Sequence, residues 1–148
     1  MSRLYPERPF LAASVAVFRD GKVLLAQRTI GTGAGQYSLP GGMVEPGERL
    51  GEACLRELKE ETGVEADLIG FVDHIEVIHR DDAGRVRTHA VVAAFAARWR
   101  AGEGEVSAEA GDIRWVDPLM PWPLPMTTGL ADVLSKAAQL ARPGKNPP

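Results

Sequence analysis

The segment that most constrains the fold of this chain runs from residue 42 to residue 64. Apolar side chains recur in it at helical spacing from Leu50 to Thr62, and Gly63 follows at a position where glycine commonly ends a helix. We therefore expect one short helix that packs against a core through an apolar stripe. The stripe consists of Cys54, Leu55 and Leu58.

The same helix concentrates negative charge. Glu57, Glu60 and Glu61 stand at i, i+3 and i+4, so their carboxylates share one face and repel one another by roughly 0.2–0.5 kcal/mol per pair. A bound cation would relieve this repulsion. Carboxylates without a His or Cys cluster suit a hard cation, Mg²⁺ or alternatively Mn²⁺, better than Zn²⁺. Small Ala53 is expected on the acidic face, where it leaves room for the ion.

Size and charge limit the remaining possibilities. The 148 residues, 45% of them hydrophobic, fit a single domain over residues 1–148, with flexible tails at 1–9 and 142–148. A net charge of −3 and scattered basic residues argue against duplex nucleic acid as a partner. The longest apolar run, residues 90–97, is too short to span a membrane, and no secretory signal is recognisable. A cytoplasmic protein with one unpaired cysteine is expected.

The rest of the chain predicts strands around this helix. Alternating and β-branched runs, separated by turn residues such as Asp20-Gly21, indicate a strand-rich fold. We expect strands at residues 11–18, 23–27, 68–78, 87–99 and 113–116, the third and fourth pairing antiparallel. A second helix is predicted over residues 130–141, capped by Thr127 or Thr128. These elements give an α+β or α/β/α arrangement.

Written as a pattern, residues 42–64 read G-x5-E-x7-R-E-L-x-E-E-x-G-V. The pattern matches the Nudix box at every position, and the chance of a random match at a given start is on the order of one in a billion. The chain is therefore identified as resembling the Nudix hydrolases. This resemblance implies the Nudix fold, an α/β/α sandwich with a central mixed β-sheet. It also implies an enzyme that uses Mg²⁺ to hydrolyse pyrophosphate bonds.

The resemblance implies roles for the residues of the box. Glu57, Glu60 and Glu61 are expected to bind the metal, and Glu48 to complete the acidic cluster. Catalytic roles are expected for Glu60, Glu61 and Arg56, with Arg56 orienting a neighbouring glutamate through a charge-assisted hydrogen bond. Gly41 and Gly42 are expected in a glycine-rich loop that approaches the substrate and the metal closely.

A further carboxylate, acting as base or ligand, is implied in the loop before a late strand that contains Trp115. Our choice is Glu109, six residues before this tryptophan. Glu105 and Asp112 are rivals in the same loop, and the sequence does not separate the three.

The likeness extends over roughly residues 11–141 to the short bacterial group of ADP-ribose pyrophosphatase-like proteins. It implies cleavage of a nucleoside diphosphate linked to a second group, first of all ADP-ribose to AMP and ribose 5-phosphate. The alternative is a normal or oxidised nucleoside triphosphate, releasing a monophosphate and pyrophosphate. A third possibility is a sensor that binds a nucleotide sugar without cleaving it.

Several side chains are candidates for contacts with a small nucleotide. Arg28 either meets a phosphate or is a solvated strand end, and Tyr37 either stacks on a base or packs in the core. Tyr5 and Phe10, like Tyr37, either stack on a base or pack in the core, and Trp122 lines the pocket or an interface.

The histidines on the long strands fit no ligand set and suit a solvated face or a dimer surface: His74, His79 and His89. The protein is expected to be a monomer or a homodimer.

Overall fold

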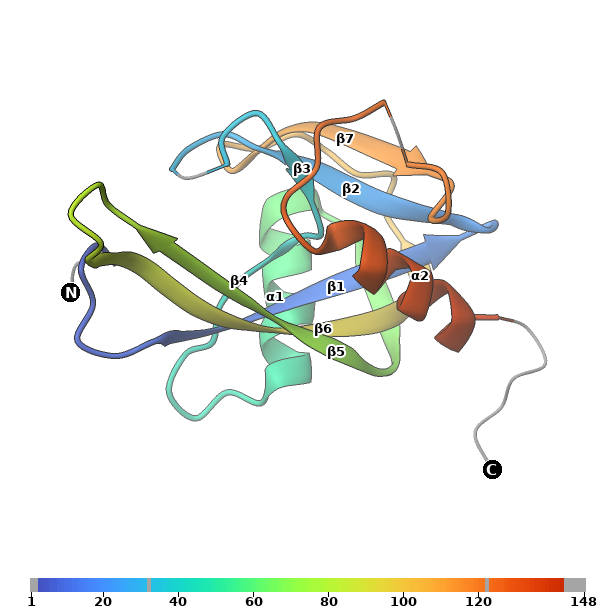
Figure 1. The fold of residues 1–148 in the computed structure, drawn as a ribbon. Helices are drawn as coiled ribbons and strands as arrows, with labels where there is room; N and C mark the ends of the chain where they lie inside the picture. The colour runs from blue at the N-terminus through green and yellow to red at the C-terminus, as the bar shows by residue number, and fades with distance from the viewer. Residues whose placement is uncertain (1–2, 32, 122, 143–148) are drawn as a thin grey trace.

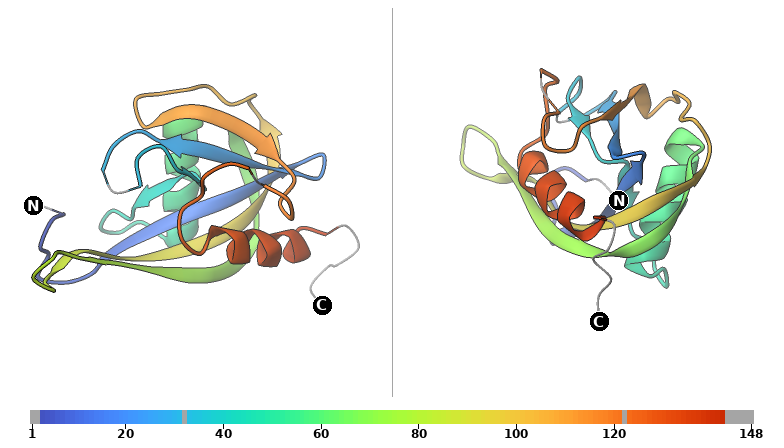
Figure 2. Two further views of the ribbon diagram at one scale, coloured as in Figure 1. Left: turned by 45° about the horizontal axis from the view of Figure 1, so that its top comes forward. Right: turned by 90° about the vertical axis from the view of Figure 1, so that its right-hand side faces the viewer.

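The computed structural model describes residues 3–31, 33–121 and 123–142, and this part of the chain folds into a mixed β-sheet between two helices (Figure 1). The strands are β1 (Phe10–Arg19), β2 (Lys22–Arg28), β3 (Tyr37–Ser38), β4 (Gly41–Met43), β5 (Glu65–Arg80), β6 (Val86–Ala101) and β7 (Ala110–Val116). The helices are α1 (Leu50–Thr62) and α2 (Leu130–Leu140). The predicted α/β/α sandwich is confirmed, because the two helices cover opposite faces of the sheet (Figure 2).

The sheet is mixed because of one parallel pair. Its strands run in the order β3-β2-β1-β6-β5, with β4 pairing with β1 and β7 pairing with β2. β1 and β6 lie parallel from Phe10↔Ala90 to Phe18↔Arg98, whereas the other strand pairs are antiparallel. The predicted β5–β6 hairpin is confirmed, and both strands extend beyond their predicted ends.

Alternation along β1 divides the interior into two cores. Val15 and Val17 pack on the α1 side with Cys54 and Leu58, whereas Ala16 packs on the α2 side. Leu55, expected in the buried stripe, is only half-buried against the α1-side core. Ala53, expected on the acidic face, is fully buried within the same core.

The two helices begin and end differently. α1 ends as predicted at Gly63, whose φ of 74° is left-handed and whose N–H donates to the Lys59 carbonyl. The predicted threonine cap of α2 is wrong, because Gly129 occupies the N-cap position with a φ of 83°. Thr127 instead hydrogen-bonds to Ser38 through its hydroxyl at 3.2 Å.

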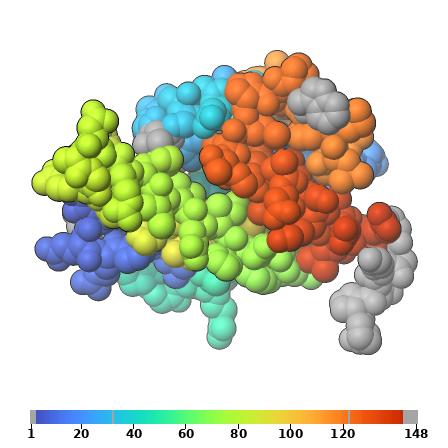
Figure 3. Space-filling model, viewed as in Figure 1, coloured from blue at the N-terminus to red at the C-terminus, as the bar shows by residue number. Residues whose placement is uncertain are grey.

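The segment before α2 is held to the short strand β3. The Tyr37 N–H donates to the Pro125 carbonyl at 2.7 Å, and the Thr127 N–H donates to the Tyr37 carbonyl at 3.1 Å. In the space-filling view the surface is hollowed between β5, the segment before β3 and the segment before α2 (Figure 3). Within the described ranges, no helix has both the length and the apolar character needed to cross a membrane.

Candidate active site

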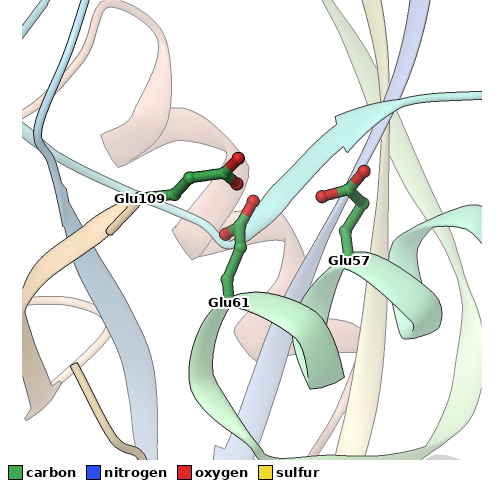
Figure 4. A group of neighbouring side chains, drawn as sticks. All are labelled: Glu57, Glu61 and Glu109. Atoms are coloured by element: carbon green, nitrogen blue, oxygen red, sulfur yellow. The ribbon is translucent and has the colours of Figure 1, made fainter. Parts of the chain in front are cut away.

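Three carboxylates meet where α1 approaches the loop that precedes β7. Glu57, Glu61 and Glu109 each offer an oxygen atom, and these atoms lie within 4.8 Å of one another (Figure 4). Two of these residues belong to the Nudix-like box, and the third is our choice among the loop candidates. An all-carboxylate group of this size suits a hard divalent cation such as Mg²⁺ or Mn²⁺.

The structure separates the three carboxylates that compete in sequence. Glu109 directly precedes β7 and joins the acidic group. Glu105 is exposed near the end of α1, where its N–H donates to the Thr62 carbonyl at 2.8 Å. Asp112 lies within β7 instead of the loop, and accepts hydrogen bonds from Tyr37 and from Arg114 Nε. Glu109 is therefore the one of the three that joins Glu57 and Glu61.

Glu61 is the buried member of the acidic group, with 9% of its surface exposed. Burial raises the pKa of its carboxyl group to about 8, and the negative charges of Glu57 and Glu109 contribute further. The Gly41 backbone amide opposes this rise by donating to the carboxylate. Near neutral pH, a cation entering this group would displace a proton from Glu61.

Arg56 organises the acidic residues beside this group. Its Nε and Nη2 donate to the two oxygens of Glu48 at 2.6 and 2.9 Å, and its Nη1 donates to Glu57 Oε1 at 3.0 Å. A further bond from Nη2 to the Met43 carbonyl, at 3.1 Å, ties the guanidinium to β4. These bonds lower the pKa of Glu48 to about 2 and raise that of Arg56. Arg56 is thus bonded to Glu57, a neighbouring glutamate of the kind that the box predicts it to orient.

Two of the expected metal ligands lie beside Arg56. Glu48 uses both of its oxygens to accept hydrogen bonds from Arg56. Glu60 contacts Arg56 Nη1 at 3.2 Å, and 59% of its side chain is exposed. Glu60 borders a cavity of about 510 Å³ between α1 and the start of β5. Glu65 and Arg100 also line this cavity. The group that the structure brings together is therefore Glu57, Glu61 and Glu109.

The two glycines expected to form a close-approach loop lie in strand β4. A Cβ atom at Gly42 would lie 2.5 Å from Glu57 Cδ. One at Gly41 would lie 2.7 Å from the Cα of Ser14 on β1. The loop assignment is therefore corrected: Gly41 lets β4 approach β1 closely, and Gly42 leaves space for the Glu57 carboxylate on α1.

The structure places the substrate candidates in different surroundings. Tyr37 is 5% exposed in the α2-side core, with its hydroxyl bound to Asp112. Arg28 is exposed at the end of β2, near Gly33. Tyr5 is exposed beneath the Arg85 guanidinium. Phe10 is half-buried, and Trp122 lies outside the described residues.

The three histidines of the long strands lie apart from the acidic group. His74 is exposed on β5 between Asp73 and Glu76, whereas His79 and His89 are half-buried. The acidic group found among the described residues contains none of the three.

Sequence reasoning missed the contacts that fix the start of the loop before β7. Arg19 lies 3.9 Å above the Trp99 ring centroid and forms hydrogen bonds of 2.7 and 3.2 Å with Glu103. Trp115 Nε1 donates to the Glu103 carbonyl at 3.1 Å. These partners are far apart in the chain, so no local pattern signals the contacts.

Comparison with known proteins gives one family. Residues 8–137 match the model of the NUDIX domain. The ADP-ribose pyrophosphatase of Methanocaldococcus jannaschii is 38% identical over 84 residues, which cover 57% of this chain and 49% of that protein. The nucleoside triphosphatase NudI of Escherichia coli O17:K52:H18 is 33% identical over 106 residues, covering 67% of this chain and 75% of that protein.

Solved structures agree with this result. The crystal structure of a MutT NUDIX hydrolase from Burkholderia pseudomallei has a TM-score of 0.75 and 28% sequence identity, covering 88% of this chain and 98% of that one. Some curated relatives are matched over only part of their own length. The matched part is 33% of one relative and 49% of each of two others.

Proposed function

This chain belongs to the NUDIX family of pyrophosphohydrolases, and we propose that its substrate is a nucleoside diphosphate linked to a second group. The leading candidate is ADP-ribose, cleaved to AMP and ribose 5-phosphate. The likeness to the Methanocaldococcus jannaschii ADP-ribose pyrophosphatase supports this choice of substrate.

The observation that supports hydrolysis of a phosphoric anhydride is the meeting of Glu57, Glu61 and Glu109 within 4.8 Å. These side chains would hold Mg²⁺, with Mn²⁺ as a substitute. The bound ion would reduce the charge on the substrate phosphates and lower the pKa of a coordinated water. Arg56 keeps Glu57 turned toward the group through the 3.0 Å bond to its Oε1. Glu48 and Glu60, the other carboxylate partners of this guanidinium, stay our predicted further ligands of the metal.

Glu109 is the exposed member of the group and extends from the loop instead of the helix (Figure 4). In our proposal its carboxylate takes the proton of the attacking water. The water oxygen bonds to phosphorus as the bond from phosphorus to the bridging oxygen breaks. The bridging oxygen leaves with the departing phosphate.

A second candidate substrate is a nucleoside triphosphate, normal or oxidised, cleaved to a monophosphate and pyrophosphate. It is supported by the likeness to the nucleoside triphosphatase NudI, which covers more of that protein than the match to the ADP-ribose pyrophosphatase does. The acidic group serves either substrate, because both contain a phosphoric anhydride.

The test is a product assay with Mg²⁺ and separate incubations of ADP-ribose, other nucleoside diphosphate sugars, dinucleoside polyphosphates, and normal and oxidised nucleoside triphosphates. AMP with ribose 5-phosphate is the expected result, whereas a monophosphate with pyrophosphate would select the second candidate. Tight binding of one compound without turnover would reject the proposal of an enzyme and favour a sensor.

The assay needs a variant that removes one cluster charge and a control that does not. Glu61→Gln should lower kcat by about 10²–10⁴-fold. Glu76→Gln is the matched control, since Glu76 lies on β5 with 61% of its side chain exposed. Wild-type turnover in the Glu61 variant would exclude the acidic group as the active site.

A further inference from the structure

We propose that Thr29 is a positioning residue for Glu109. Thr29 holds the loop of residues 107–110 so that the Glu109 carboxylate stays within reach of Glu57 and Glu61. The inference deepens the proposed function and rests on it, because it concerns how the same acidic group is assembled.

The contacts of Thr29 lie on both sides of Glu109 in the chain. Its Oγ1 donates a hydrogen bond of 2.6 Å to the carbonyl of Ala108, the preceding residue. Its Cγ2 faces the backbone of Gly111, where a Cβ atom would lie only 2.9 Å away. One side chain therefore binds the loop through its hydroxyl and packs on Gly111, the second residue of β7, through its methyl group.

The position of Thr29 follows from an irregularity in the sheet. β2 and β7 pair regularly from Val23↔Val116 to Ala26↔Ile113, and the register then shifts before Arg28↔Ala110. Such a bulge redirects the side chains that follow it. Thr29 comes immediately after the last paired residue of β2, and Glu109 immediately before the first residue of β7.

The loop closes on itself, and its last residue, Ala110, pairs with Arg28 of β2. The Ser107 N–H donates to the Ala110 carbonyl at 2.9 Å, and the Ala110 N–H donates to Ser107 Oγ at 3.2 Å. These bonds join the two ends of the turn, and neither of them involves Ala108 or Glu109. The negative charge of Glu57 favours a loop that turns Glu109 outward into solvent. The Thr29 bond to Ala108 opposes that movement.

The two parts of the threonine side chain can be tested separately. Thr29→Val keeps the shape and removes the hydroxyl, whereas Thr29→Ser keeps the hydroxyl and removes the methyl group. Thr88→Val is the matched control, because the Thr88 hydroxyl is buried without a hydrogen-bond partner among the described residues. Binding of Mn²⁺ to the nucleotide-free protein, measured by electron paramagnetic resonance, reports on the acidic group independently of turnover.

We expect Thr29→Val to weaken Mn²⁺ binding about 3- to 10-fold and to lower kcat by a similar factor, the size of one hydrogen bond. KM for the nucleotide should stay within about twofold, since Thr29 is assigned no substrate contact. Thr29→Ser should restore most of the loss, and Thr88→Val should behave as wild type. Wild-type Mn²⁺ affinity in Thr29→Val would overturn the inference.

A double-mutant cycle distinguishes positioning from a general effect on the fold. If Thr29 acts through Glu109, adding Thr29→Val to Glu109→Gln will weaken Mn²⁺ binding no further. Additive losses would overturn the inference. A wild-type protein that binds Mn²⁺ but cleaves no nucleotide would reject the proposed function, and the Mn²⁺ cycle would still decide the role of Thr29.

Discussion

Gly42 on β4 lies directly against the Glu57 carboxylate on α1. A Cβ atom at this position would come within 2.5 Å of Glu57 Cδ and 2.7 Å of both carboxylate oxygens. The missing side chain at position 42 therefore helps to set the position of a carboxylate in the acidic group.

Gly42→Ala should move Glu57 away from Glu61 and lower kcat by about 10- to 100-fold, because misplaced catalytic groups cost this much. Mn²⁺ binding should weaken in parallel. Gly70→Ala is the control, since a Cβ at Gly70 meets Leu140 Cδ2 at an ordinary 3.6 Å. Steady-state kinetics and Mn²⁺ titration of both variants test the relationship, and equal effects would contradict it.

Replacing Arg56 tests the bidentate bond to Glu48. Lysine keeps the charge but cannot form the paired bonds of 2.6 and 2.9 Å, so Arg56→Lys should lower kcat at least 10-fold. The free energy of unfolding should fall by about 1–3 kcal/mol, as expected for loss of hydrogen bonds between charged groups. Urea denaturation measures this change. Arg49→Lys, at an exposed pair with Glu52 at 3.9 Å, should leave both quantities nearly unchanged.

Two carboxylates of the loop before β7, Glu109 and Glu105, can be compared by their effects on kcat. Glu109→Gln should lower kcat by about 10²–10⁴-fold because it removes the proposed base from the acidic group. Glu105→Gln should stay within about threefold of wild type, since the Glu105 contact with Thr62 uses the backbone. Rates at saturating substrate and Mg²⁺ measure both effects. A larger loss in the Glu105 variant would reverse the assignment.

The raised pKa of Glu61 predicts how stability depends on pH in the absence of metal. The carboxyl group loses its proton near the ordinary 4.5 when unfolded, but only near about 8 when folded. Between these values the folded protein binds more protons, so the free energy of unfolding falls as pH rises and levels off above about 8. A shift of this size sets an upper limit of about 5 kcal/mol for the fall, at about 1.4 kcal/mol per pKa unit.

Urea denaturation in EDTA from pH 5 to pH 9 measures this dependence. Glu48 gives no competing signal there, because its folded pKa of about 2 affects stability only below its ordinary 4.5. Glu61→Gln should flatten the profile, and Mg²⁺ should stabilise the wild type more as pH rises. A wild-type profile that is already flat would show that Glu61 titrates normally.

The elements predicted most closely are those set by local pattern. α1 spans Leu50–Thr62 as expected, since its apolar recurrence and the glycine after it are signals within one segment. Strand β4 was missed because Gly41 and Gly42 have no intrinsic preference for a strand. Their strand geometry comes from pairing with Ser14 and Ala13 on β1, which is a tertiary contact.

The site shows the same division between local and long-range information. Helical spacing places Glu57, Glu60 and Glu61 on one face but does not reveal that Arg56 contacts both Glu57 and Glu60. The spacing of the loop likewise leaves its three carboxylates equivalent. The β2–β7 pairing ends at Arg28↔Ala110, directly beside Glu109, and this distinguishes Glu109 from the other two. No local sequence pattern predicts where that pairing ends.

The parallel pairing of β1 with β6 has a consequence for how the protein is made. Each β1 residue from Phe10 to Phe18 pairs with a residue 80 positions later, so a long segment must be synthesised before the sheet can close. α1 leaves the ribosome before β6. It therefore lacks the part of its core that β6 supplies until β6 has been synthesised. Nascent chains arrested before Arg98 should therefore lack protection of α1 by Mg²⁺ against proteolysis. The ability to bind the ion would be acquired only after β6 and the loop before β7 have been synthesised.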